Sequence, residues 1–310
     1  MQETISYVRQ VKDLPLFPER DKSIDDHAYL KQVMQLGPLV RDSFFGVHTF
    51  SHRHMLAMLN DDLTRQLETE GIDMIGIGAG AIRDFFANVM LFSNGEVHRN
   101  RRAPLARAFA FPIVKAMRAD IRRTAEAIIQ PLLGKGEIDF LDQIAGPMPA
   151  RIIAPILGVP EADIPLFTRL VYSSIRVLSS RSRGVFEAAE QDLGKLNDYV
   201  ADVLADRQRA PQDDFLSAYL DRVKDSPLDP LEVRIQIVGL ILAGSDTTRS
   251  AIATTFARLL EDPAQWAGFR ADSEGLKADA ASEGLRFDPV VGSLSRIAVK
   301  DLVLEGTRIP

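Results

Sequence analysis

The segment Asp229–Pro263, which reads DPLEVRIQIVGLILAGSDTTRSAIATTFARLLEDP, decides the fold. It opens with a helix start signal, because Asp229 is a candidate N-cap, Pro230 suits the first helical position and Glu232 follows the cap by three residues. Pro263 cannot continue a helix and predicts its end. The residues between are apolar on most helical faces, as in a helix that crosses a sizeable core. Such a helix would be about 50 Å long at 1.5 Å per residue.

The middle of this segment, Ala243–Thr248, reads AGSDTT and is a weak helix former. Gly244 allows another group to approach the backbone closely. The hydroxyl of Thr247 can bond to the carbonyl of Ala243, and the carboxylate of Asp246 is costly to bury unless it is paired or used. The pattern predicts a reaction site built into a core helix. It fits equally well two helices joined by a Gly-Ser-Asp-Thr loop.

Composition limits the function classes. The apolar fraction of 46% and charged fraction of 26% are those of an ordinary globular protein. A net charge of −6 argues against nucleic-acid binding. No window is long and apolar enough to span a membrane, and residues 1–12 lack the apolar core of a signal peptide, so we expect a cytoplasmic protein. The absence of cysteine excludes disulfides, thiolate metal sites and cysteine nucleophiles in these 310 residues.

The rest of the chain predicts a mainly α fold. Four stretches between residues 112 and 224 have apolar residues at helical spacing: 117–133, 142–157, 161–180 and 186–209. Residues 39–50 read as a β-hairpin, residues 136–141 as a possible short strand, and the end of the chain as two strands with a turn. No low-complexity linker or repeat divides the chain. We therefore predict one domain over residues 1–310, with a small β-subdomain from residues 39–50 and 290–309.

Two charged patterns are candidate sites. His98 and Arg102 are four residues apart, so they share one helix face. With Arg99 and Arg101 they form a basic cluster that suits carboxylate binding, although the pattern alone favours a solvated surface helix. Glu283 and Arg286 have the spacing of an ordinary surface ion pair.

Two further patterns do not predict a binding site. The GIGAG sequence at residues 76–80 follows no β-rich run, so we expect a loop instead of a dinucleotide-binding turn. His52 and His54 point apart on a helix, which argues against a metal site between them.

Taken together and in this order, the motifs resemble those of the cytochrome P-450 family, the haem-thiolate monooxygenases. The resemblance rests on Ala243-Gly244-x-Asp246-Thr247-Thr248 within a long apolar helix, on His98-x-x-x-Arg102 and on Glu283-x-x-Arg286. It covers nearly the whole chain. It implies a cytochrome P-450-like helical fold and a haem b cofactor.

The resemblance also implies roles for individual residues. Thr247 would orient a water molecule, Asp246 would relay protons from solvent, and Ala243 with Gly244 would leave room for dioxygen. His98 and Arg102 would hold one haem propionate, and Arg296 would hold the other. The walls of the substrate pocket would be Gly239, Leu242, Ala243 and Val291. A structural ion pair would be formed by Glu283 and Arg286.

The implied partners are a small apolar substrate, O₂ and a ferredoxin- or reductase-type electron donor. The family's iron ligand is a cysteine thiolate, which favours O–O cleavage, and this sequence has none. We therefore expect a C-terminally truncated member that lacks the cysteine loop and is not competent alone. Two alternatives stay open: a haem-thiolate peroxygenase or rearrangement enzyme, and a haem-free helical binding protein derived from the same fold.

Overall fold

The computed structural model describes residues 9–21, 23–43, 46–60, 62–109, 117–179 and 182–310. The chain has two compact units. Unit 1 consists of Met1–Leu67 and Ser295–Pro310, and unit 2 consists of Glu68–Leu294. That both units act as one domain stays a prediction.

Unit 1 holds the strands in three small sheets. The predicted hairpin is β2 (Leu39–Arg41) paired antiparallel with β3 (Val47–Thr49); residues 44–45 between them lie outside the described part. The second sheet pairs β4 (Thr64–Gln66) antiparallel with β5 (Arg296–Ala298). The third has the order β1 (Arg9–Gln10), β7 (Thr307–Ile309) and β6 (Leu302–Leu304), with β1 parallel to β7. The sequence did not indicate β1 or β4.

The helices of unit 1 are short, and α1 contributes to a small apolar cluster. They are η1 (Val11–Asp13), α1 (Asp26–Met34) and α2 (His52–Met58). α1 begins where the side chain of Asp25 accepts a hydrogen bond from the amide of Ala28. The cluster consists of Tyr29, Val33 and Val40, with Phe17, Ile24 and Phe50 packed against it.

Unit 2 is helical in the part of the chain that the structure describes, which confirms the predicted mainly α class. Its first elements are α3 (Glu70–Asp73), α4 (Ala81–Asn88), η2 (Met90–Phe92), α5 (Gly95–Ala108), α7 (Arg118–Ile129) and η3 (Gln130–Leu132). Next come η4 (Leu141–Ala145), α8 (Pro147–Ile156), η5 (Glu161–Asp163), α9 (Ile164–Ser174), α10 (Arg176–Ser179) and α11 (Arg183–Arg209). The last are α12 (Phe215–Val223), α13 (Pro230–Glu261), α14 (Pro263–Ala271) and α15 (Ser273–Phe287).

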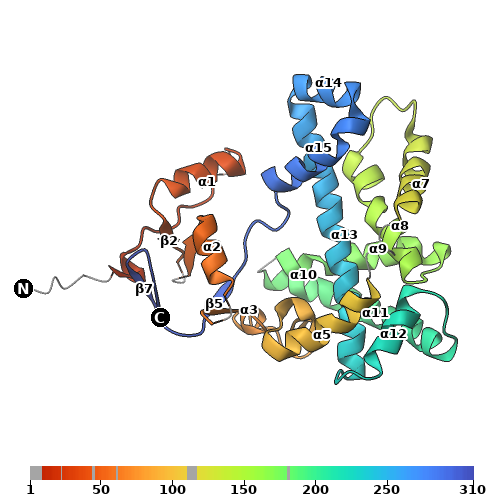
Figure 1. The fold of residues 1–310 in the computed structure, drawn as a ribbon, viewed down its shortest axis with the longest axis horizontal. Helices are drawn as coiled ribbons and strands as arrows, with labels where there is room; N and C mark the ends of the chain where they lie inside the picture. Colours follow the sequence, from red (N-terminus) through yellow and green to blue (C-terminus); the bar gives the residue numbers. More distant parts are fainter. Residues whose placement is uncertain (1–8, 22, 44–45, 61, 110–116, 180–181) are drawn as a thin grey trace, which may run out of the picture. The chain divides into compact units, whose positions relative to one another are not determined.

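α13 is one continuous helix of 32 residues, so the alternative of two helices joined by a loop is wrong. Its start is the predicted capping box, in which Asp229 accepts from the amide of Glu232 and Glu232 accepts from the amide of Asp229. Buried apolar residues such as Ile235, Ile241 and Leu242 place it in the main core. In unit 2 it packs against α8, α9 and α11, and α14 and α15 adjoin its C-terminal end (Figure 1).

Two local predictions differ from the structure. The possible strand at 136–141 is absent from the described residues there: the chain is irregular until the π-helix η4 begins at Leu141. Gly136 has no side chain to pack in a strand, and Asp139 starts the helical turn by accepting the amide of Asp142. The helix predicted over residues 161–180 is divided into η5, α9 and α10.

Among the described residues, no helix has the length and apolar character needed to cross a membrane.

Candidate functional site

The segment Ala243–Thr248 keeps its helical form because its hydroxyls bond to the helix itself. Thr247 Oγ1 donates to the carbonyl oxygen of Ala243 at 2.7 Å, as predicted, and Ser245 Oγ donates to that of Ile241 at 2.7 Å. The two hydroxyls lie on different faces. Ser245 is fully buried, whereas Ala243 and Thr247 are exposed. The segment therefore offers a small side chain and an oriented hydroxyl on its open face.

Gly239 and Gly244 of α13 are contact points with neighbouring segments. A Cβ at Gly244 would lie 2.9 Å from Cδ1 of Ile153 on α8, and one at Gly239 would lie 2.6 Å from Cγ2 of Val89. The space beside Gly244 is therefore used by Ile153. Gly239 packs against Val89, and Leu242 is fully buried in the core. Of the predicted pocket walls, Ala243 and Val291 are exposed.

Asp246 is half-buried and paired with an arginine. Arg249 Nη2 donates to Asp246 Oδ1 at 2.5 Å, and the Arg249 guanidinium carbon lies 4.6 Å from the ring centroid of Tyr172 on α9. The Tyr172 hydroxyl donates to the carbonyl of Gly146 at 2.6 Å. Burial, supported by the nearby Asp246 charge, raises the pKa of Tyr172 to about 12. The phenol thus stays protonated at neutral pH and holds one side of the guanidinium that orients Asp246.

Arg249 and Tyr172 were missed by the sequence analysis. The spacing of Arg249, three residues after Asp246, was an available signal because residues i and i+3 are neighbours on a helix. Tyr172 gave no signal, since only the packing of α9 against α13 brings it to Arg249.

His98 and Arg102 are one turn apart on α5, as predicted. His98 is half-buried and Arg102 is exposed. His98 Nδ1 lies 3.1 Å from the carbonyl oxygen of Met90, which can only accept, so this nitrogen carries the hydrogen. The Nε2 atom is left to contact another group. When both ring nitrogens carry hydrogen, Nε2 of His98 can donate to a carboxylate beside the Arg102 guanidinium.

Arg101 does not belong to the predicted basic cluster. It is buried, and its Nη2 pairs with Glu232 Oε1 at 2.8 Å. Arg101 Nη1 also donates to the carbonyl of Ala87 at 3.1 Å. The physical reason is helical geometry: Arg101 and Arg102 are about 100° apart around the axis, so only one of them can follow His98 on its face. Arg101 therefore ties α5 to the first turn of α13.

Gln236 of α13, a second residue missed by the sequence analysis, continues this connection. Its side chain is 1% exposed. Its Oε1 accepts from the amide of Met90 at 2.8 Å, and its Nε2 donates to the carbonyl of Asn88 at 2.7 Å. Met90 thus donates its amide hydrogen to Gln236, and its carbonyl accepts a hydrogen bond from His98. A glutamine within an apolar helix was the available signal.

The contacts from Gln236 through Met90 to His98 place His98 on the same side of α13 as the segment Ala243–Thr248. Gln236, Ala243 and Thr247 have the spacing i, i+7 and i+11, so they share one helical face. Gln236 points to Met90, which binds His98. Ala243 follows Gln236 by seven residues, or about 10 Å along the axis. His98, Ala243 and Thr247 are therefore brought to one side of the helix.

Glu283 and Arg286 form an exposed ion pair on α15, with Arg286 Nε 2.7 Å from Glu283 Oε2. The hydrogen bond from Arg286 lowers the pKa of Glu283. The intervening Gly284 packs against the side chain of Thr255 on α13. α15 therefore lies close to α13 while its charged pair faces outward.

Arg296, the third predicted propionate ligand, belongs to unit 1. Its Nε donates to Thr64 Oγ1 at 3.0 Å and its Nη2 donates to the Thr64 carbonyl at 3.1 Å, so its side chain lies along β4. No group of three or more His, Asp or Glu side chains able to hold a metal ion occurs among the described residues.

Comparison with known proteins adds family evidence. Residues 165–272 match the family model described as cytochrome P-450. The chain is 43% identical over 259 residues to the plant-inducible cytochrome P-450-pinF1 of Rhizobium radiobacter, covering 83% of this chain and 61% of the relative. It is 29% identical over 241 residues to luteothin monooxygenase of Streptomyces thioluteus, covering 77% of this chain and 59% of the relative. The chain thus spans about three fifths of these curated relatives.

Solved structures share the fold. The structure of CalO2 superposes with a TM-score of 0.84 at 25% identity, covering 96% of this chain and 75% of that one. The complex of P-450BioI with an acyl carrier protein bearing hexadec-9Z-enoic acid gives a TM-score of 0.81 at 23% identity, covering 92% and 74%. The predicted helical architecture is confirmed by both.

Proposed function

Because this chain belongs to the cytochrome P-450 family, we propose that it carries the oxygen-activating helix of a haem-dependent monooxygenase that hydroxylates a small apolar molecule. The observation that supports this most is the open face of α13. There the Thr247 hydroxyl is oriented by Ala243, next to the arginine-paired carboxylate of Asp246. Its partners would be the substrate, O₂ and a ferredoxin- or reductase-type electron donor.

The residues present fit part of a haem site. His98 and Arg102, one turn apart, suit the propionates, because charge-assisted bonds to carboxylates are strong. The small, exposed Ala243 suits close approach of a flat cofactor. The axial thiolate is not provided, since these 310 residues contain no cysteine. We therefore expect the chain alone to be inactive and to give no thiolate-type carbon monoxide difference spectrum.

Thr247 and Asp246 would deliver protons to the reaction. A bound haem with a thiolate ligand supplies the electron-rich iron that favours O–O cleavage. The Thr247 hydroxyl gives its hydrogen to Ala243, so its oxygen can accept a hydrogen bond from a water molecule and orient it. Asp246, whose side chain is 28% exposed, can take protons from solvent and pass them on when it leaves Arg249.

Thr247→Ala tests this role in a haem-loaded enzyme that contains this chain and a thiolate ligand. Loss of the hydroxyl should lower the fraction of consumed electrons found in product several-fold, because the water is no longer held. The ratio of product to reductant consumed measures this. Thr254→Ala is the matched control, since Thr254 makes the same bond, to Ser250 at 3.0 Å, two turns further on. If the ratio of product to reductant consumed is unchanged in Thr247→Ala, Thr247 has no role in the mechanism.

The missing cysteine favours a second candidate, a haem-free helical binding protein. Titration of the 310-residue chain with haemin, followed by absorbance, separates the two. Under the proposed function, uptake is specific and His98→Ala or Arg102→Ala weakens it several-fold, because each removes a propionate partner. Arg107→Ala is the control, because this exposed arginine of α5 lies about 140° from Arg102 and about 180° from His98 around the helix axis. Absence of specific uptake supports the haem-free protein.

A further inference from the structure

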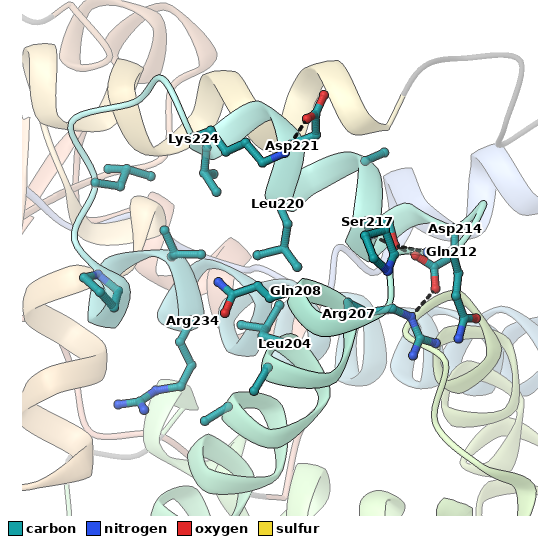
Figure 2. Close-up of a pocket in the computed structure, with 18 of the residues that line it drawn as sticks. Leu204, Arg207, Gln208, Gln212, Asp214, Ser217, Leu220, Asp221, Lys224 and Arg234 are labelled. Carbon is teal, nitrogen blue, oxygen red and sulfur yellow. Dashed lines mark hydrogen bonds and ion pairs between the residues drawn. The ribbon is translucent and has the colours of Figure 1, made fainter.

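Unit 2 contains a cavity of about 900 Å³ that the proposed oxygen chemistry does not use. It lies between the C-terminal end of α11, α12 and the first turns of α13 (Figure 2). Its volume is within the range of small-molecule sites. His98, Arg102, Asp246 and Thr247 are not among the residues that line it. Binding in this cavity would therefore be independent of the proposed monooxygenase function.

The middle of the cavity is apolar. Leu204 of α11 and Leu220 of α12 line it and belong to the main core. Val223, Leu228 and Val233 add further apolar surface. An uncharged, apolar ligand body would therefore gain free energy by leaving water and covering this surface.

Most charges around the cavity are already paired. Arg207 Nε binds Asp214 Oδ2 at 2.5 Å, and Lys224 Nζ binds Asp221 Oδ1 at 2.9 Å. Both pairs lie apart from Arg234 in Figure 2. The opposite charges within each pair cancel, so the two pairs add no net charge to the cavity.

Arg234 is different. It is half-buried on α13, and the described residues give it no hydrogen bond or ion pair. Its Nε atom is buried without a partner. A buried donor of a permanent cation is costly to leave unpaired, so such a group needs an explanation. Asp213, which also lines the cavity, is exposed.

We propose that this cavity binds an organic carboxylate with an apolar body. The carboxylate would pair with the guanidinium of Arg234, whose planar fork matches two carboxylate oxygens. The body would lie against Leu204 and Leu220. One unpaired cation selects a monoanion, because a phosphate dianion would need a second one. Gln208 of α11 also lines the cavity, and its amide can donate to the ligand (Figure 2).

Octanoate and its uncharged analogue octanamide are suitable probes for the 310-residue chain, with binding measured by calorimetric titration. Octanoate should bind at least tenfold more tightly than octanamide, since a hydrogen bond to a charged group exceeds a neutral one. Arg234→Gln should remove this preference and weaken octanoate at least tenfold. Ala205→Trp, at an exposed position that lines the cavity, should weaken both probes by filling it.

Arg222→Gln is the matched control, because Arg222 is exposed on α12 and does not line the cavity. It should leave both affinities unchanged, and so should haem loading. Equal binding of octanoate and octanamide, or octanoate binding that survives Arg234→Gln, overturns the proposal. Loss of octanoate binding in Arg222→Gln to the same degree as in Arg234→Gln also overturns it, because net charge would then explain the effect.

Discussion

Glu232→Ala is expected to destabilise unit 2 by about 3–5 kcal/mol, because it leaves the buried Arg101 without its counter-charge. Arg101 is 6% exposed, so water cannot replace the lost carboxylate. The same substitution removes the acceptor for the Asp229 amide at the start of α13. Urea denaturation, followed by the fluorescence of the single tryptophan, Trp266, measures the free energy of unfolding.

The double variant Arg101→Met with Glu232→Gln separates charge from packing. It removes both charges and keeps an acceptor at the N-terminal turn, so it should be markedly more stable than Glu232→Ala. Glu283→Ala is the control for a surface pair, where solvent screens the charges and little change is expected. If the double variant loses as much stability as Glu232→Ala, the buried charge is not the cause.

The sequence predicted the elements whose signals are local. The capping box at Asp229 and the proline at Pro263 bounded α13 correctly, because both act within a turn of the helix end. The hairpin at 39–50 was also local. By contrast, β1 pairs with β7 across almost the whole chain, and two residues of strand carry no periodicity.

The same distinction applies to the candidate site. The bond from Thr247 to Ala243 was predictable because it spans one turn. The partners of Arg101 and the ring beneath Arg249 were not, because they depend on how helices cross. Gly239 and Gly244 show the limit most directly: a glycine indicates close approach, but only packing tells that Val89 and Ile153 are what approaches.

Gln236→Leu is expected to cost about 2–4 kcal/mol, although it keeps the helix and nearly the same volume. It leaves the Met90 amide and the Asn88 carbonyl without their partner, and each unsatisfied group costs about 1–3 kcal/mol. The Met90 carbonyl also accepts the hydrogen bond from His98. We therefore expect the segment around Met90 to open locally, in addition to the loss of global stability. Hydrogen exchange of a peptide covering residues 85–92 should quicken more than that of the α13 core.

Gln265→Leu is the matched control, since this glutamine is exposed on α14 and bonds only within its own N-terminal turn among the described residues. It should change neither stability nor exchange at 85–92. Uniformly faster exchange throughout unit 2 in Gln236→Leu would show a general loss of packing. Selective opening at Met90 would instead show that α13 sets the position of His98 through one buried amide side chain, two turns before Ala243.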